Sequence, residues 1–519
     1  MSHPNSLAEH FHNRTKYSPT SIARRAKSAM QGPQPEPFKV YRLGTDVDLK
    51  PYLDESKVSP QASHEERSWA RLSHFLINVY GLTAQIATGI GKTFYLRAAP
   101  SAGGLYPTEI YLVSRGNYLL PAGLYNYQAR SHSLWRFWDD HVWQPLQEAC
   151  FWHPALETTQ MAVILTSVFY RSAWRYQDRA YRRVCLDAGH VLGNLELAGA
   201  LVDYRAHLIG GYCDQAANQL LYLDENAEST IAIAAIADLL QVEQNLPHLT
   251  TTQPAPQQTD FPRLPDGKLL PYIHRATCIE QDNDFRWASR EQSVPDQVGP
   301  SAVAIPEDKY NFPFGLKVTT ATSPIDWDHH LRGLEKTILR RRSTRKFSGA
   351  SLTLEELNAV LDFTYQPHHY LDQGLDSDPD YCDLSLIQTF VAVSGIDNLD
   401  AGCYYYAPFR QELRQIRFKN FRAELHFLCL NQDLGHEAGA VIFHTADLKT
   451  AIARYGDRGY RYLHLDAGHL GQRLNLAAIR LGLGISGIGG FFDDQVNDLL
   501  GIPEDEAVLY ITALGRPAA

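Results

Sequence analysis

The stretch RYQDRAYRRVCLDAGH at residues 175–190 occurs a second time as RYGDRGYRYLHLDAGH at residues 454–469. Eleven of the sixteen positions are identical, and the two copies lie 279 residues apart. The same offset pairs AGLYNY (122–127) with AGCYYY (401–406), and IGGYCDQ (209–215) with IGGFFDD (488–494). This pattern indicates one long unit made twice, unlike a solenoid, in which many short units stack.

The length of 519 residues exceeds what one hydrophobic core usually serves, so two domains are expected. We predict an N-terminal half at 1–245, with an extension at 1–60, and a C-terminal half at 321–519. The segment 246–320 is rich in Pro, Gln, Thr and Asp, which is typical of a linker or wrapping arm. An offset of 278 relates Phe38-Lys39-Val40 to Leu316-Lys317-Val318, so the duplication extends over nearly the whole chain.

Periodicity predicts α+β domains. After each repeated motif, apolar residues recur every three or four positions, from Val184 to Val202 and from Leu463 to Leu481, which indicates a helix. Apolar runs with β-branched residues at 109–114, 161–167, 440–445 and 507–514 predict buried strands.

Composition excludes some classes of function. The net charge of −10, with both signs interspersed, argues against a nucleic-acid surface. No window has about 18 consecutive apolar residues, and the N-terminus lacks the apolar core of a signal peptide. We expect a cytoplasmic protein that binds a small molecule or peptide, and neither nucleic acid nor membrane.

Two further motifs can carry chemistry, one in each half. RRSTRKF (341–347) precedes SLTLEEL, which predicts a capped helix start. Its guanidinium groups and hydroxyl match the geometry of a phosphate or a ring carbonyl; the candidates are Arg341, Arg342, Ser343 and Arg345. In the first half, APSAGGLYP (99–107) has small residues that allow backbone to approach closely. Its resemblance to a known flavin-binding signature implies Pro100, Ser101, Ala102, Gly103 and Gly104 as candidates.

These motifs resemble two signatures of the FMN-dependent nitroreductase family. RRSTRKF looks like the family's N-terminal signature, in which the first Arg, the Ser and the second basic residue hold FMN. PSAGGLYP resembles the SagB/ThcOx (McbC-like) branch, which includes azoline-oxidising dehydrogenases of peptide natural-product pathways. The resemblance implies two tandem nitroreductase-fold domains, each a mostly antiparallel sheet flanked by helices, packed as an intramolecular pseudo-dimer.

Each half lacks the motif that the other keeps. At offset 279 from PSAGGLYP the second half has PDYCDLSL (379–386), and in place of RRSTRKF the first half has SPQASHEER (59–67). In the family, flavin lies at a homodimer interface and takes one motif from each subunit. The resemblance therefore implies one composite FMN site, whereas the symmetry-related site would have neither motif.

The resemblance also implies further cofactor contacts from the second half. Gly489 and Gly490 align with the family turn whose backbone amide contacts flavin N5. Asn431 would lie near the pyrimidine ring, and Arg516 would neutralise the FMN phosphate.

The repeated RYxDRxYR motif leaves two interpretations open. It resembles the Lys-Tyr pair that azoline dehydrogenases use for acid/base chemistry near the flavin. Because arginine stays protonated, proton transfer would pass to Tyr176 or Tyr455. Because both halves keep the motif, a structural role capping the central helix is at least as well supported.

Three functions remain compatible with these residues. The first is an FMN-dependent oxidoreductase, with hydride transfer to or from N5 and a peptide azoline as substrate. The second is NAD(P)H-dependent reduction of nitro or quinone compounds, and the third is flavin binding without turnover. No metal is expected, because the repeated Asp-x-x-His (Asp187/His190 and Asp466/His469) lacks a complete ligand set and fits buried hydrogen-bonded pairs.

Overall fold

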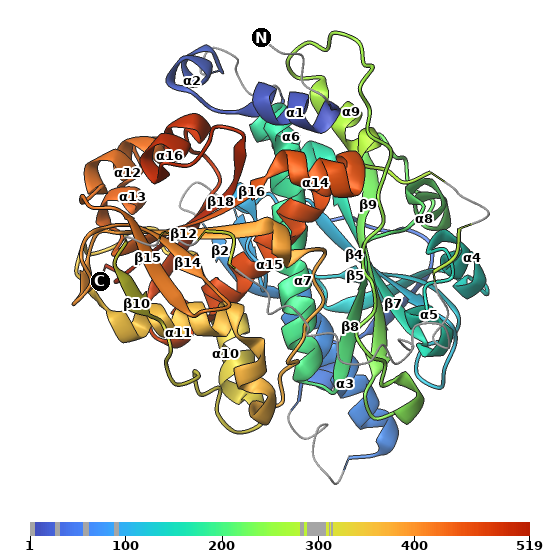
Figure 1. Cartoon of the computed structure of the whole chain (residues 1–519). Coiled ribbons are helices and arrows are strands. Elements are labelled where there is room, and N and C mark those ends of the chain that lie inside the picture. The colour runs from blue at the N-terminus through green and yellow to red at the C-terminus, as the bar shows by residue number, and fades with distance from the viewer. Residues whose placement is uncertain are drawn as a thin grey trace, which may run out of the picture.

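The computed structural model describes residues 6–25, 32–54, 62–87, 93–280, 285–287, 308–310, 312 and 315–518. Two large sheets lie on either side of a central pair of long helices (Figure 1). The predicted α+β fold of two sheets flanked by helices is confirmed. In the part of the chain that the structure describes, no helix is both long and apolar enough to cross a membrane.

Each half forms one antiparallel sheet of seven strands. In spatial order, the first sheet contains β1 (Thr45–Asp48), β6 (Ser133–Trp138), β5 (Gly123–Gln128), β4 (Thr108–Ser114), β7 (Met161–Val168), β9 (Glu228–Asp238) and β8 (Tyr204–Ile209). The second contains β10 (Lys317–Thr319), β15 (Glu412–Arg417), β14 (Gly402–Ala407), β12 (Ile387–Val393), β16 (Ala440–Asp447), β18 (Glu506–Gly515) and β17 (Gly484–Ile488). The four predicted strands are the central β4, β7, β16 and β18, which are buried almost throughout.

Helices cover both sheets. The first half contains α3 (His64–Tyr80), α4 (Trp143–Ala149), α5 (Ala155–Thr158), α6 (Phe169–Tyr176), α7 (Ala180–Ala200) and α8 (Asp214–Leu220). The second contains α10 (Arg332–Arg340), α11 (Leu354–Tyr365), α12 (Arg422–Leu428), α13 (Asp433–Glu437), α14 (Leu448–Tyr455), α15 (Gly459–Arg480) and α16 (Asp493–Leu500). Shorter strands form the hairpin β2 (Leu82–Ala87) and β3 (Thr93–Arg97), and the parallel pair β11 (Leu352–Thr353) and β13 (Ile396–Asp397). The predicted helix start at SLTLEEL is confirmed, since Thr353 and Glu356 form a capping box on α11.

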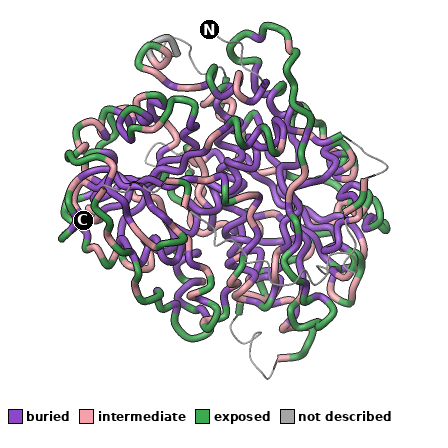
Figure 2. The backbone as a smooth tube through the Cα atoms, viewed as in Figure 1, coloured by how far each residue is buried: buried purple, intermediate pink, exposed green. Residues whose placement is uncertain are grey.

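The two central helices, α7 and α15, are the predicted helices that follow the repeated motif. They pack against each other along the middle of the molecule and are buried on nearly all sides (Figure 2). At their crossing, a Cβ added to Gly189 would overlap the carbonyl oxygen of Leu465. A Cβ added to Gly468 would likewise overlap the carbonyl oxygen of Leu186. The DAGH sequence in both copies thus lets two helix backbones touch.

The N-terminal segment and the predicted arm each contain one helix, and these two helices are equivalent elements of the duplication. α1 (Leu7–Thr15) and α9 (Leu269–Ala276) lie side by side at one end of the molecule (Figure 1). Asp457 accepts a hydrogen bond from the Ala8 amide at 2.9 Å, and Asp178 accepts one from the Leu269 amide at 2.8 Å. The motif of each half therefore caps one of these helices. The offset between LAEHFHNRT and LLPYIHRAT is 262, so a search at 279 misses their equivalence.

The register of the edge strands corrects one sequence alignment. Val47 of β1 pairs with Leu134, and Val318 of β10 pairs with Leu413 at the equivalent position of the second sheet. The counterpart of Val318 is therefore Val47, and the alignment of 38–40 with 316–318 is wrong. Insertions between elements change the offset along the chain, whereas strand pairing preserves the equivalence of positions.

The helix crossing generates a stability prediction. Gly189→Ala should lower the free energy of unfolding by about 2 kcal/mol or more, because two backbones would have to move apart. Gly193→Ala on the same helix is the matched control, since its added Cβ would meet mainly the side chains of Gln472 and His469. Urea unfolding of both variants measures the difference. Equal stability of the two would contradict the proposed constraint.

Candidate active site

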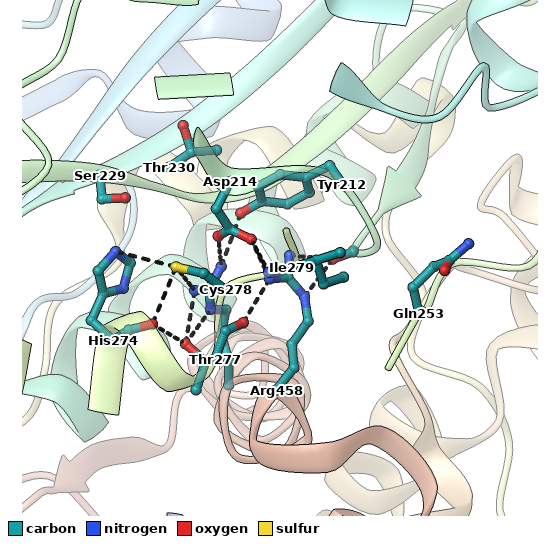
Figure 3. A network of polar contacts seen from close by, with 12 residues as sticks. Tyr212, Asp214, Ser229, Thr230, Gln253, His274, Thr277, Cys278, Ile279 and Arg458 are labelled. Atoms are coloured by element: carbon teal, nitrogen blue, oxygen red, sulfur yellow. Dashed lines mark hydrogen bonds and ion pairs between the residues drawn. The ribbon is translucent and has the colours of Figure 1, made fainter. Parts of the chain in front are cut away.

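The arginines of the repeated motif join the two halves. Arg179 and Arg182 of the first half each place a guanidinium nitrogen 2.8 Å from Asp493, which begins α16 of the second half. Arg458 and Arg461 repeat this arrangement with Asp214, at 2.6 and 2.7 Å. Figure 3 shows Asp214 facing Arg458, with Thr277 and Cys278 of the segment after α9 beside them.

Both aspartates are fully enclosed. Burial favours the neutral form, but the two guanidiniums outweigh burial and hold the pKa of Asp214 and of Asp493 below its ordinary value. The carboxylates are therefore ionised at neutral pH and neutralise buried positive charge. These contacts support the structural interpretation of the motif's arginines.

The tyrosines of the motif have different surroundings in the two halves. Tyr176 lies beside the PSAGG loop, because a Cβ added to Gly103 would approach its hydroxyl. The guanidinium of Arg183 stacks on the Tyr176 ring at 4.0 Å. Tyr455 instead donates a hydrogen bond to Asp383 at 2.9 Å, and its carbonyl accepts one from the Ala255 amide. Only Tyr176 adjoins the loop predicted to hold a cofactor.

The structure brings the two complementary motifs together. Arg341 is buried, and its Nε and Nη2 atoms donate to the carbonyl oxygens of Ala98 and Arg97 at 2.7 and 3.0 Å. Only Ala99 separates these carbonyls from the PSAGG loop, which begins at Pro100. The Ser101 hydroxyl and the Ala102 amide donate to Asp187 on α7, at 2.6 and 3.1 Å. The second-half RRSTRKF segment and the first-half PSAGG loop therefore share one corner of α7.

The glycine turn after β17 completes this corner. Thr344 of RRSTRKF pairs with Ile485 of β17 through two hydrogen bonds, of 2.8 and 3.0 Å. The strand leads directly to Gly489 and Gly490, and a Cβ on Gly489 would overlap Nη1 of Arg183. Among the described residues, no hydrogen-bond acceptor faces the amides of Gly489 and Gly490. Two adjacent donors without an acceptor are what a ligand with acceptor atoms requires.

The equivalent turn of the first half is covered by the chain itself. The amides of Gly210 and Gly211 both donate to the carbonyl of Thr251, at 2.7 and 3.0 Å. Tyr462, the counterpart of Arg183 at offset 279, places its hydroxyl 2.9 Å from the carbonyl oxygen of Gln253. The predicted arm therefore enters the symmetry-related position and occupies its donors. Sequence analysis missed this contact, because nothing in the composition of 251–253 specifies where the segment lies.

The other residues predicted to hold a cofactor are dispersed around this corner. Ser343 is half-buried and Arg345 is exposed. Arg342 donates instead to the Thr83 carbonyl and hydroxyl on β2, each at 3.1 Å. Gly103 and Gly104 adopt φ of 67° and 65°, a conformation that favours glycine and that turns the loop after Ser101.

Two predicted residues do not join the cluster by their side chains. Asn431 is exposed after α12, although its neighbour Leu430 lies where a Cβ on Gly490 would point. Arg516 pairs with Glu356 in the first turn of α11 at 2.8 Å. That carboxylate already neutralises the guanidinium, so the geometry gives no support to a phosphate contact by Arg516.

Three polar residues at this corner were not predicted as site residues: Asp187, His190 and Tyr510. Burial raises the pKa of Asp187 to about 7 and lowers that of His190 to about 4. His190 Nδ1 lies 3.0 Å from the carbonyl of Leu186, so the Nε2 atom of the neutral ring accepts from the Tyr510 hydroxyl at 3.2 Å. Asp187 and His190 are thus buried and hydrogen-bonded as expected, but to different partners. The repeated DAGH could have indicated Asp187 and His190 as site residues. Nothing in the sequence distinguishes Tyr510 from the other residues of its strand.

The comparisons with known proteins agree with this fold. The nitroreductase family model matches residues 21–237 and again 338–516, so the chain belongs to the nitroreductase family. The crystal structure of a "putative nitroreductase" from Anabaena variabilis is 59% identical, with a TM-score of 0.90 over 99% of this chain and 100% of that one. A "Putative nitroreductase" of Methanocaldococcus jannaschii is 31% identical over 171 residues, which are 33% of this chain and 85% of the relative. The family makes the protein an oxidoreductase.

The buried ion pairs generate a second prediction. Asp493→Asn should cost about 3 kcal/mol of stability, because it leaves Arg179 and Arg182 buried without a counter-charge. Asp266→Asn, which removes the exposed partner of Arg14, is the control and should cost less than about 1 kcal/mol. Chemical denaturation measures both. Similar losses in the two variants would show that Asp493 does not hold the halves together.

The raised pKa of Asp187 predicts a pH dependence. Its pKa is about 7 in the folded protein, against an ordinary value of 3.8. Between pH 3.8 and pH 7 the folded state therefore binds one more proton at Asp187 than the unfolded state does. This contribution to stability is complete below about pH 4 and is lost as pH rises through 7, at about 1 kcal/mol per pH unit. Asp187→Asn should remove that slope. Urea midpoints from pH 5 to 8 test this, and an unchanged slope in the variant would contradict it.

Proposed function

We propose that the protein is an FMN-dependent oxidoreductase with a single composite flavin site between its halves. The difference between the two glycine turns carries this proposal. The amides of Gly489 and Gly490 are available, and the two complementary motifs lie beside them. At the symmetry-related turn, the Thr251 carbonyl already occupies the equivalent amides.

The residues of this corner fit the cofactor. Ser343, Arg345 and the remaining donors of Arg341 would hold the phosphate and the pyrimidine edge, where Arg345 would stabilise negative charge on the reduced ring. The amides of Gly489 and Gly490 would face the ring. When bound, the flavin supplies the redox chemistry by accepting or donating a hydride at N5.

Tyr176 is the residue proposed to handle protons of the substrate. It adjoins Gly103 and faces the Gly489 turn through Arg183, whereas Tyr455 is bound to Asp383 beside the arm. A phenol hydroxyl both donates and accepts, so it can deliver or remove a proton at a substrate held over the ring. The PSAGGLYP loop and Tyr176 together favour the SagB/ThcOx-like dehydrogenases, with a peptide azoline or related substrate.

A second candidate is NAD(P)H-dependent reduction of nitro or quinone compounds. The 59% identical relative, which matches 99% of this chain, is named a "putative nitroreductase" and favours this alternative. Anaerobic bleaching of the flavin by NAD(P)H, followed by reoxidation with a nitroaromatic compound, would support the reductase. Oxidation of an azoline peptide without NAD(P)H would support the dehydrogenase. If neither reaction is observed, the protein binds flavin without turnover.

The stoichiometry of FMN tests the composite site. The purified chain should bind one FMN, measured by flavin absorbance against protein concentration. Two FMN per chain would show that the arm does not block the second position. No FMN at all would overturn the proposed function.

The cofactor contacts are tested by the double variant Ser343→Ala/Arg345→Ala. Losing a hydroxyl and a charged donor should weaken FMN binding at least about tenfold. Lys346→Ala, an exposed charge next to Arg345, is the control and should change affinity by less than about threefold. Equilibrium dialysis measures both, and unchanged occupancy of the double variant would refute this assignment.

A further inference from the structure

Arg183 is a buried guanidinium that forms no ion pair with any residue that the structure describes. The residue is 4% exposed, and within the described ranges its Nε atom is enclosed and has no hydrogen-bond partner. In the described part of the chain, every other buried arginine donates at least one hydrogen bond to a carboxylate or a carbonyl; these are Arg97, Arg171, Arg179, Arg182, Arg341, Arg414, Arg458, Arg461 and Arg473. Arg183 donates no such hydrogen bond to any described residue. Its guanidinium contacts the Tyr176 ring and lies against Gly489.

The carboxyl group one helical turn away does not fully neutralise it. Asp187 on α7 is bound by the Ser101 hydroxyl and the Ala102 amide. Burial raises the pKa of Asp187 to about 7; the charge of Arg183 lowers this pKa, but the two side chains form no ion pair. A guanidinium that stays ionised while buried destabilises the folded state unless an anion accompanies it. The site therefore carries an uncompensated positive charge against the Gly489–Gly490 turn.

The second half shows what lies at this position when it is filled. Tyr462, the counterpart of Arg183, has its hydroxyl 2.9 Å from the Gln253 carbonyl and accepts from the Gln253 amide at 3.2 Å. At Tyr462, a neutral hydroxyl is thus sufficient to hold an uncharged ligand such as a peptide group. At the equivalent position beside the Gly489–Gly490 turn, the permanently charged Arg183 requires an anionic ligand.

We propose that Arg183 binds an anionic group of the substrate, a carboxylate in the simplest case, directly over the Gly489–Gly490 turn. This inference rests on the proposed function, because the substrate would lie on the flavin placed there. The guanidinium would hold the carboxylate with paired N–H donors while the Tyr176 ring supports its other face. Arg183 is then a specificity residue that selects anionic over neutral compounds of the same shape.

The experiment compares benzoate with benzamide as probes. Isothermal titration of the FMN-loaded chain should show benzoate binding at least about tenfold tighter than benzamide. Arg183→Tyr, which installs the residue of the second half, should weaken benzoate at least about tenfold and leave benzamide unchanged. Arg183→Lys keeps the charge without the paired donors and should fall between them. Arg332→Gln, an exposed arginine on α10, is the control and should change benzoate affinity by less than about threefold.

Thermal unfolding supplies a second readout that does not depend on activity. Removing an unpaired buried charge should leave Tm unchanged or raise it in Arg183→Tyr, whereas loss of a structural ion pair would lower it. Benzoate should raise Tm of the wild-type chain and not that of Arg183→Tyr.

The inference is overturned if wild type does not distinguish benzoate from benzamide, if Arg183→Tyr binds benzoate normally, or if that variant has a lower Tm. It is also overturned if the variant loses FMN more than benzoate, because Arg183 would then serve the cofactor. A wild-type chain without FMN would refute the proposed function instead. The benzoate and benzamide titrations of that flavin-free chain would still decide whether Arg183 binds an anion.

Discussion

At the centre of the molecule, the backbones of α7 and α15 approach so closely at Gly189 and Gly468 that neither position has room for a Cβ. This contact sets how the two sheets face each other, because each helix is also the main helix packed on its own half. It also brings the start of each helix to the other half's glycine turn. The buried pairs of Asp214 and Asp493 with arginines of the opposite half then hold that arrangement.

The two halves preserve their mutual packing and differ in what lies beside it. Both keep the motif aspartate that caps an arm helix and both keep the interhalf ion pairs. Of the two turns, only that of the second half has amides without an acceptor among the described residues, since residues 251–253 cover the other. The same scaffold thus has one polar surface available to a ligand and one satisfied internally, so symmetry of the fold does not require symmetry of binding.

The charges of Arg183 and Asp187 do not stabilise the fold by themselves. Both side chains project from the same side of α7, yet Arg183 has no ion-pair partner among the described residues and Asp187 is close to half-protonated at neutral pH. Both conditions are unfavourable for the folded state by themselves. Their persistence beside the complementary motifs agrees with a site in which local stability is given up for binding.

The sequence by itself determined the duplication, the central helices, the buried strands and the complementary loss of two motifs, because these depend on local periodicity and on identities at a constant offset. It did not reveal the equivalence of α1 and α9, since insertions change the offset to 262. Nor did it show that Arg342 and Arg516 have other partners. Only the tertiary structure decided that Tyr176 adjoins the open turn while Tyr455 lies under the arm. The reason is physical. Two motifs with the same local sequence can pack against different segments, and that packing depends on contacts between residues far apart in the chain.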